Sequence, residues 1–346
     1  MNSFQIGAIL IQDGVTTGAI YALLGMALVL LFAVTRVMFF AQGEFVVYGA
    51  LSLAWLTMGK VPGTLWLMVG MAILAGLCDA IEAIRDGNYR HVGRLVATHL
   101  VAPLLLAAVV VWAAPREMPF FFLCLLALLI VTAIGPLLYR LVYQPMANAS
   151  VLVLLIVSVG IHFVLVSFSL IFFGVEGFRT PRFWDGSFML GSLRVNGQNA
   201  IVVGVTAVLI IALAVVFNRT LWGKALRAAA SNTVGARLLA ISVSFSGKLS
   251  FTIAAFIGAL CGMLIAPIVT LYYDSGLLIG LKGFVASIFG GLVSYPMTLL
   301  GALGIGIVEA FSSFKASAYK EAIVFLLVVP VLLWLSLRSG SHEEEH

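Results

Sequence analysis

Three acidic residues stand inside or beside strongly apolar stretches, where a charge could do chemistry. They are Asp13, Glu44 and Glu309. A charged side chain at bilayer depth is costly, and it usually faces a cavity, a partner charge or an ion pathway. Proton- or sodium-coupled carriers use such groups, so these acids are the candidates for ion coupling. Asp13 and Glu44 are equally compatible with the membrane surface, which leaves this interpretation thinly supported.

The sequence carries no nucleotide-binding or catalytic motif that we can identify. It has no G-x-x-x-x-G-K-[ST] phosphate loop, no H-E-x-x-H zinc motif and no serine nucleophile elbow. His99 and His162 are isolated histidines in or beside apolar stretches, and such residues more often pack between helices than bind a metal. We therefore expect a chain that is not an enzyme, with no metal site and no cofactor of its own.

A short polar break interrupts the apolar sequence at Gln42-Gly43-Glu44. Gly43 gives the backbone freedom, so the break predicts a kinked helix or a re-entrant hairpin near the cytoplasmic face. The simpler alternative is that Glu44 sits in the first turn of the next helix and favours its positive end. A second break is predicted at Gly290-Gly291. The gating or structural candidates are Gln42, Gly43, Glu44, Gly290, Gly291 and Glu309.

The longest polar and basic interval is 218–248. It holds five of the chain's nineteen Lys and Arg and no Asp or Glu; the five are Arg219, Lys224, Arg227, Arg237 and Lys248. Short basic loops between membrane spans lie on the cytoplasmic side. Residues 224–241 are rich in Leu, Ala and Arg and lack Pro, which favours a short helix at that surface. The alternative is a basic loop that only fixes the orientation of the protein.

The elements that must position these residues are membrane helices. Of the 346 residues, 62% are hydrophobic and 10% are charged, whereas about one quarter of a soluble domain is charged. This composition predicts an all-α polytopic membrane protein with about 8–11 transmembrane or re-entrant helices. The expected spans are 6–34, 44–59, 62–78, 95–113, 119–140, 150–174, 199–217, 249–272, 276–294, 297–313 and 321–337.

The distribution of basic residues predicts the orientation. With 218–248 inside, the inner loops as far as Lys248 hold Arg36, Arg85, Arg90, Arg94, Arg140 and the five residues of that interval. The outer loops over the same range hold Lys60, Arg116, Arg179, Arg182 and Arg194. This bias places the N-terminus outside and the C-terminus in the cytoplasm. The net charge of +5 thus comes mostly from loop residues that set the orientation in the membrane. No nucleic-acid partner is expected.

Two loops are longer than simple connections. Residues 79–94 form a mixed-charge cytoplasmic loop with a turn signal at Asp86-Gly87-Asn88. Residues 175–198 form the main external loop, whose aromatic and arginine side chains suit either the membrane interface or an external partner. The charged tail 340–346 is expected to be disordered.

Four stretches resemble the permease subunits of branched-chain amino acid ABC importers of the LivH type. They are 13–24 (DGVTTGAIYALL), 39–45 (FFAQGEF), 223–241 (GKALRAAASN…LAI) and 283–312, which contains GFVASIFGG and Glu309. The chain departs from the family at Gln42, where His is usual, and at Ser231, where Glu is usual. The family's C-terminal motif is absent, and 79–118 is unmatched, as an insertion would be.

The resemblance implies a single transmembrane permease domain, 1–346, whose segment 218–248 is a cytoplasmic coupling loop. The expected partners are two ATP-binding subunits, which bind the ATP, a second homologous permease subunit and an extracytoplasmic solute-binding protein. Small side chains would let the coupling helix dock, and arginines would pair with acidic partner residues. The coupling residues so implied are Arg227, Ala228, Ala229, Ala230, Gly235 and Arg237.

The implied location is the bacterial inner membrane, and the implied solutes are branched-chain amino acids or similar small polar molecules. Similar permeases use urea, short amides and small carboxylates, so the solute stays open. The alternative functions are an ion-coupled secondary carrier or channel that uses Asp13, Glu44 and Glu309, and a membrane scaffold or enzyme.

Overall fold

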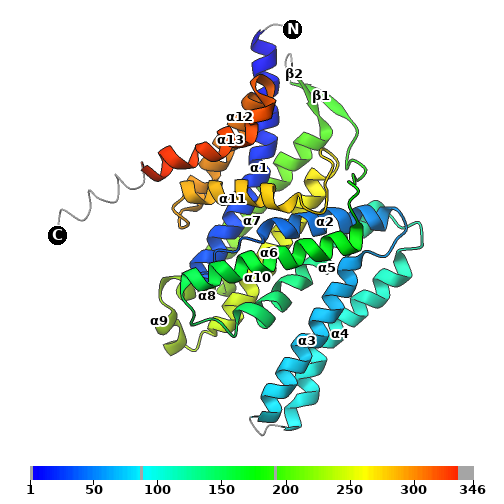
Figure 1. Ribbon diagram of the computed structural model, residues 1–346, viewed down its shortest axis with the longest axis vertical. Coiled ribbons are helices and arrows are strands. Elements are labelled where there is room, and N and C mark those ends of the chain that lie inside the picture. Colours follow the sequence, from blue (N-terminus) through cyan, green and yellow to red (C-terminus); the bar gives the residue numbers. More distant parts are fainter. Residues whose placement is uncertain (1–2, 86–88, 191–192, 334–346) are drawn as a thin grey trace, which may run out of the picture.

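The computed structural model describes residues 3–85, 89–190 and 193–333, and these are almost entirely helical (Figure 1). The elements are α1 (Ser3–Thr35), α2 (Gln42–Thr57), α3 (Gly63–Arg85), α4 (Tyr89–Ala113), α5 (Phe120–Leu138) with a π-helical turn (Tyr139–Tyr143), α6 (Val151–Phe173), β1 (Ser187–Leu190), β2 (Leu193–Asn196), α7 (Gly197–Arg219), α8 (Leu221–Ser231), α9 (Thr233–Leu238), α10 (Val243–Ile265), α11 (Gly276–Phe289), α12 (Tyr295–Lys315), a 3₁₀ turn (Ser317–Tyr319) and α13 (Lys320–Leu326).

Within the described residues, seven helices are long and apolar enough to cross a membrane, namely α1, α3, α5, α6, α7, α10 and α12. This confirms the all-α membrane architecture. The expected spans 44–59 and 276–294 correspond to the shorter helices α2 and α11, of 16 and 14 residues. The last expected span, 321–337, and the tail 340–346 extend beyond the described residues.

The segment predicted as a cytoplasmic loop, 79–94, is mostly helical, so that prediction is wrong. Helix α3 runs on to Arg85 and α4 begins at Tyr89; the predicted turn at 86–88 lies outside the described residues. The loop prediction gave weight to charge, but Ala, Ile and Glu between 79 and 85 are compatible with helix. The charges are also satisfied, because the Arg140 guanidinium on the π-helical turn pairs with both Asp79 and Glu82.

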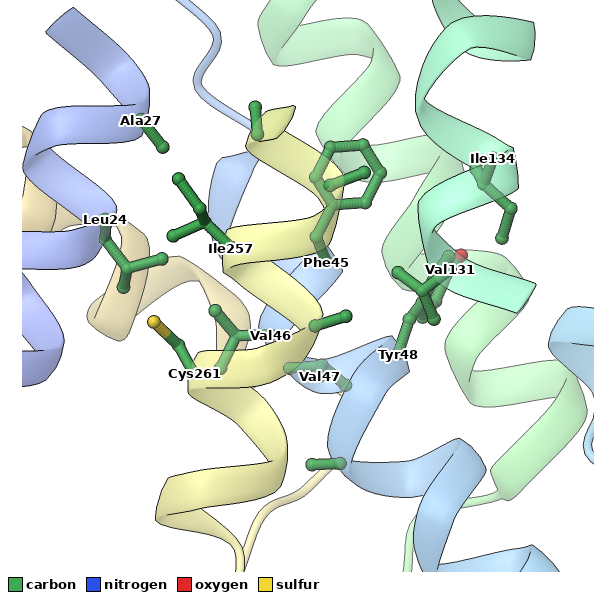
Figure 2. Close-up of a cluster of buried hydrophobic side chains, with 14 of the residues drawn as sticks. Leu24, Ala27, Phe45, Val46, Val47, Tyr48, Val131, Ile134, Ile257 and Cys261 are labelled. Atoms are coloured by element: carbon green, nitrogen blue, oxygen red, sulfur yellow. The ribbon is translucent and has the colours of Figure 1, made fainter. Parts of the chain in front are cut away.

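Helix α10 forms the centre of the core. Figure 2 shows Ile257 and Cys261 of α10 between Leu24 of α1 on one side and Val131 of α5 on the other. All of these side chains are buried. Helix α2 packs beside α10 through glycines, since an added Cβ at Gly262 would lie 1.9 Å from the Val46 carbonyl oxygen. The Gly258-x-x-x-Gly262 pattern of α10 therefore serves the close approach of two helices.

A second backbone-to-backbone contact joins α1 to α12. An added Cβ at Gly14 would lie 2.6 Å from the Cα of Ile307, and one at Gly306 would lie 2.2 Å from the Gly14 carbonyl oxygen. Only glycine fits at such a crossing. The two glycines of Gly14-x-x-x-Gly18 thus hold the long first helix against α12.

Different elements pack beside the two ends of α1 (Figure 1). The β1–β2 hairpin, which the all-helical prediction did not include, lies beside its N-terminal end, and α8 lies against its C-terminal end. The expected span 249–272 is too long, because α10 ends at Ile265. The residues that follow form a loop tied to the loop 175–198 by paired hydrogen bonds between Phe178 and Leu271.

Candidate functional site

The basic interval folds as two short helices rather than the single helix predicted over 224–241. Asn232 leaves helical geometry with φ −153° and ψ 103°, which ends α8. Its side-chain oxygen then accepts a hydrogen bond of 2.9 Å from the Gly235 amide, in the first turn of α9. Asparagine is favoured at such a start because it satisfies an amide that has no partner within the helix. The sequence signal for the break was therefore present at Asn232.

The small side chains of α8 face the rest of the chain. Ala229 is fully buried and packs with Leu226 against Leu30 and Val34 of α1. Ala228 and Ala230 are half-buried. In this conformation Ala229 packs α8 against α1. The resemblance implied that the small residues of this helix, Ala229 among them, face a partner subunit.

The outward surface of α8 and α9 is both basic and apolar. Arg227 is exposed and donates a hydrogen bond to Asn218. Leu238 is 84% exposed and Leu239 is 75% exposed, and neither was singled out from the sequence. Large apolar side chains this open to solvent often mark an interaction surface. The side chain of Arg237 lies outside the described residues. We call the exposed set Leu221, Trp222, Lys224, Arg227, Leu238 and Leu239 the coupling surface.

A cavity of about 510 Å³ lies beside the C-terminal ends of α1 and α8. Its lining includes Arg36, Ser231 and Asn232, together with the end of the π-helical turn and the start of α6. Arg36 is exposed and has a positive φ of 58°, because the chain leaves α1 there and turns toward α2. The cavity thus lies between the C-terminal end of α8 and residues 34–37, the segment that leads toward the polar break.

The polar break lies deep in the protein at the start of α2. Gln42 and Glu44 are both 0% exposed, and the Gln42 amide nitrogen donates a 2.9 Å hydrogen bond to the Ala254 carbonyl oxygen of α10. The Glu44 carboxylate lies 3.0 Å from Nδ1 of His162 on α6. The expected first-turn position of Glu44 is observed. The role of His162 is more than helix packing, because it faces an acid.

Helices α2 and α11 begin at the same place. An added Cβ at Gly43 would lie 1.8 Å from the Gly276 carbonyl oxygen. One at Gly276 would lie 2.5 Å from Oε1 of Glu44. The Glu44 carboxylate is thus packed against the first residue of α11, where the helix carries a partial positive charge. We call Gln42, Glu44, His162 and the two glycines the α2–α11 junction.

The junction leaves polar atoms without hydrogen bonds. Among the described residues, Gln42 Oε1, both Glu44 carboxylate oxygens and His162 Nδ1 are buried and lack a partner of good geometry. Each buried polar group left in this way costs about 1–3 kcal/mol. Such groups are rare in native proteins, and they occur where a bound water, an ion or a functional role compensates for the missing hydrogen bond.

A second polar cluster joins α11 to the C-terminal helices. The Lys282 ammonium is 6% exposed and lies 2.6 Å from Oε1 of Glu309 on α12. It also lies 3.0 Å from Glu321 on α13. The Tyr21 hydroxyl of α1 donates a 2.7 Å hydrogen bond to the other Glu309 oxygen. We call these four residues the Lys282 cluster; it ties four helices together.

The structure separates the three acids considered for ion coupling. Asp13 and Glu309 line one cavity of about 340 Å³ with Thr17 and Ser313. Glu44 is not among the residues that line it. Nothing in the sequence indicated this division, because all three acids stand in apolar stretches alike.

The Gly290-Gly291 pair lies in the turn between α11 and α12, so the expected span 276–294 is too long. Helix α11 ends at Phe289 and α12 begins at Tyr295. Gly291 has a positive φ of 59°, which glycine adopts readily. Gly290 is enclosed, since an added Cβ would lie 2.3 Å from the Thr298 hydroxyl. These glycines lie at the opposite end of α11 from the α2–α11 junction.

Sequence reasoning missed the residues that complete both clusters. Lys282 stands alone in the apolar stretch 276–294, and a search for basic as well as acidic residues there would have found it. Nothing in the sequence joins His162 to Glu44, because the pairing depends on how α6 packs against α2. The side chain of His99 lies outside the described residues.

Comparison with known proteins places this chain among transport permeases. The family described as "Branched-chain amino acid transport system / permease component" matches residues 92–332. The high-affinity branched-chain amino acid transport system permease protein LivH of Escherichia coli K12 is 26% identical over 330 residues, covering 93% of this chain and 91% of that protein.

Two further relatives come from other organisms. The permease protein BraD of Pseudomonas aeruginosa is 26% identical over 275 residues, which is 78% of this chain and 88% of that protein. A probable LivH of Methanocaldococcus jannaschii is 27% identical over 226 residues, with 61% of this chain and 72% of that protein covered. No solved structure matches the chain.

Proposed function

The chain belongs to the family of permease components of branched-chain amino acid transport systems, and we propose that it is the membrane permease subunit of an ATP-driven importer. Its solutes would be branched-chain amino acids, as the names of the relatives suggest, or similar small polar molecules. ATP would be bound and hydrolysed by separate subunits, so this chain would need no catalytic group or cofactor. Residues 1–346 would form one permease domain, with 79–118 as an insertion.

The assembly would contain two ATP-binding subunits, a second permease related to this one and an external solute-binding protein. The family match supports partners of the ATPase and binding-protein types. The coupling surface supports the inner contact, because it combines exposed leucines with exposed basic residues on two short helices. We assign it as the surface to which an ATP-binding subunit binds. The β1–β2 hairpin and its loop would meet the binding protein at the other end of α1.

The coupling surface carries the proposal, and its exposed leucines test it. In proteoliposomes containing the assembled transporter, we expect leucine uptake to require ATP and to be absent with an ion gradient alone. Leu238→Glu and Leu239→Glu should each weaken binding of the ATP-binding subunits by about 2 kcal/mol, or roughly 30-fold, the usual scale for a central interface residue. Copurification and surface plasmon resonance would measure the loss.

The matched control is Val175→Glu, which places the same charge on a 69% exposed apolar residue of the external loop. It should leave binding of the ATP-binding subunits unchanged. Ion-driven uptake without ATP would support the ion-coupled carrier instead. Normal binding in both leucine variants would rule out the coupling surface as the contact.

The proposed orientation places the N-terminus outside, the coupling surface in the cytoplasm and the C-terminus in the cytoplasm, in a bacterial inner membrane. The test uses a Cys78→Ser background, because Cys78 is an exposed free thiol. A membrane-impermeant maleimide added to intact cells should label Ser187→Cys on the hairpin and spare Ser231→Cys at the end of α8. After the cells are opened, both should react. The reverse pattern in intact cells would contradict the orientation.

A further inference from the structure

The α2–α11 junction contains acceptors that the folded chain does not use. Both carboxylate oxygens of Glu44 and Oε1 of Gln42 are buried without a hydrogen bond among the described residues. The imidazole of His162 lies 3.0 Å from Glu44 without completing a hydrogen bond. Three oxygen acceptors held together in this way are suited to a ligand that brings several N–H donors.

The oxygen acceptors favour a positively charged group, whereas the helix starts around them favour a negatively charged one. Helices α2 and α11 are both short, and both begin at the junction. The start of a helix carries a partial positive charge and unpaired amide groups, which favour an anion. Glu44 supplies that anion here, because its carboxylate lies against Gly276. In membrane transporters, short helices that begin inside the bilayer commonly form the solute site in this manner.

We propose that the α2–α11 junction is a transient binding site for a zwitterionic amino acid on its way through the permease. The Glu44 carboxylate and the side-chain amide oxygen of Gln42, Oε1, bind the α-ammonium group of the solute. The beginning of α11, released from Glu44, faces the α-carboxylate. This inference rests on the proposed function, since it assumes that an amino acid crosses the chain.

The junction is closed in this conformation, and its glycines provide a way to open it. Gly43, Gly276 and Gly280 meet without side chains between them, so no side chain of these three residues blocks a separation of α2 and α11 at this point. While the site is empty, His162 Nδ1 lies 3.0 Å from the Glu44 carboxylate without completing a hydrogen bond to it. The solute ammonium supplies the missing donors and the opposite charge when it enters, which removes the cost of burying the acid without a full partner.

The test measures leucine binding to the detergent-solubilised complex of permeases and ATP-binding subunits, without the binding protein. Tritiated leucine is the probe, and 2-hydroxy-4-methylpentanoate, which has a hydroxyl in place of the ammonium, is the competitor. Glu44→Gln keeps the shape and removes the charge. It should weaken leucine binding about 100-fold, as expected for a buried charge pair that loses one member, and change the affinity of the hydroxy acid less than about threefold.

Tyr48→Phe is the matched control, because Tyr48 lies one turn along α2 and its hydroxyl bonds to the Leu165 carbonyl oxygen. It should leave the ratio of the two affinities unchanged. Equal losses for leucine and the hydroxy acid in Glu44→Gln would mean a structural role and overturn the proposal. So would unchanged leucine binding, or a wild-type complex that transports leucine without binding it in this assay. Absence of ATP-driven uptake by the wild type would instead refute the proposed function.

Discussion

Gly43→Ala is expected to prevent normal folding of the permease. The added methyl would lie 1.8 Å from the Gly276 carbonyl oxygen and 2.6 Å from its carbonyl carbon. These are backbone atoms at the start of another helix, so no side-chain rotation relieves the clash. Overpacking a core costs about 1–3 kcal/mol when side chains can adjust, and here we expect more than about 3 kcal/mol. Detergent-solubilised protein should aggregate on size exclusion or melt far below the wild type.

The matched control is Gly304→Ala in α12. This residue is exposed, and an added Cβ there meets nothing within 4 Å. The change should be neutral or slightly stabilising, because alanine is the better helix former. Equal melting temperatures for the two variants would mean that α2 and α11 do not meet as described.

Lys282→Met is the second large effect that we expect. It leaves Glu309 and Glu321 close together with no cation between them. Removing one member of a buried ion pair costs about 3–5 kcal/mol, because the remaining charge stays buried and uncompensated. The variant should lower the thermal stability of the solubilised permease and reduce uptake.

A double variant separates the charge from the packing. Lys282→Met with Glu309→Gln removes one charge of each sign and should recover part of the lost stability. Lys320→Met is the control, since Lys320 is 41% exposed and lies 3.9 Å from Glu321. An exposed pair of this kind is worth less than about 1 kcal/mol. No recovery in the double variant would mean that the cluster does not hold α11 by charge.

Much of the fold follows from apolar length and glycine spacing. Helices such as α6 and α7 begin and end within a few residues of the expected spans, because hydrophobic length alone sets them. The close contacts of Gly258 and Gly306 agree with the tendency of glycine inside a membrane helix to mark a close approach of two helices.

The rest depended on local chemistry or on tertiary contacts. The charged end of α3 looked like a loop, because its partner Arg140 is 61 residues away along the chain. The break at Asn232 depends on a local capping hydrogen bond to the Gly235 amide, which the helical composition of 224–241 does not reveal. The pairing of Glu44 with His162 could not be predicted, because no sequence pattern states which face of α6 meets α2.

The unbroken length of α1 has a mechanical consequence. Its 33 residues correspond to about 50 Å at 1.5 Å per residue. Its last turns pack against α8, and its first turns line the cavity that Asp13 and Glu309 also line. Gly14 and Gly18 hold the first half of this rod against α12, and Gly25 packs against both α11 and α12. One continuous helix therefore joins the surface that contacts α8 at Val34 to the wall of the cavity beside Asp13.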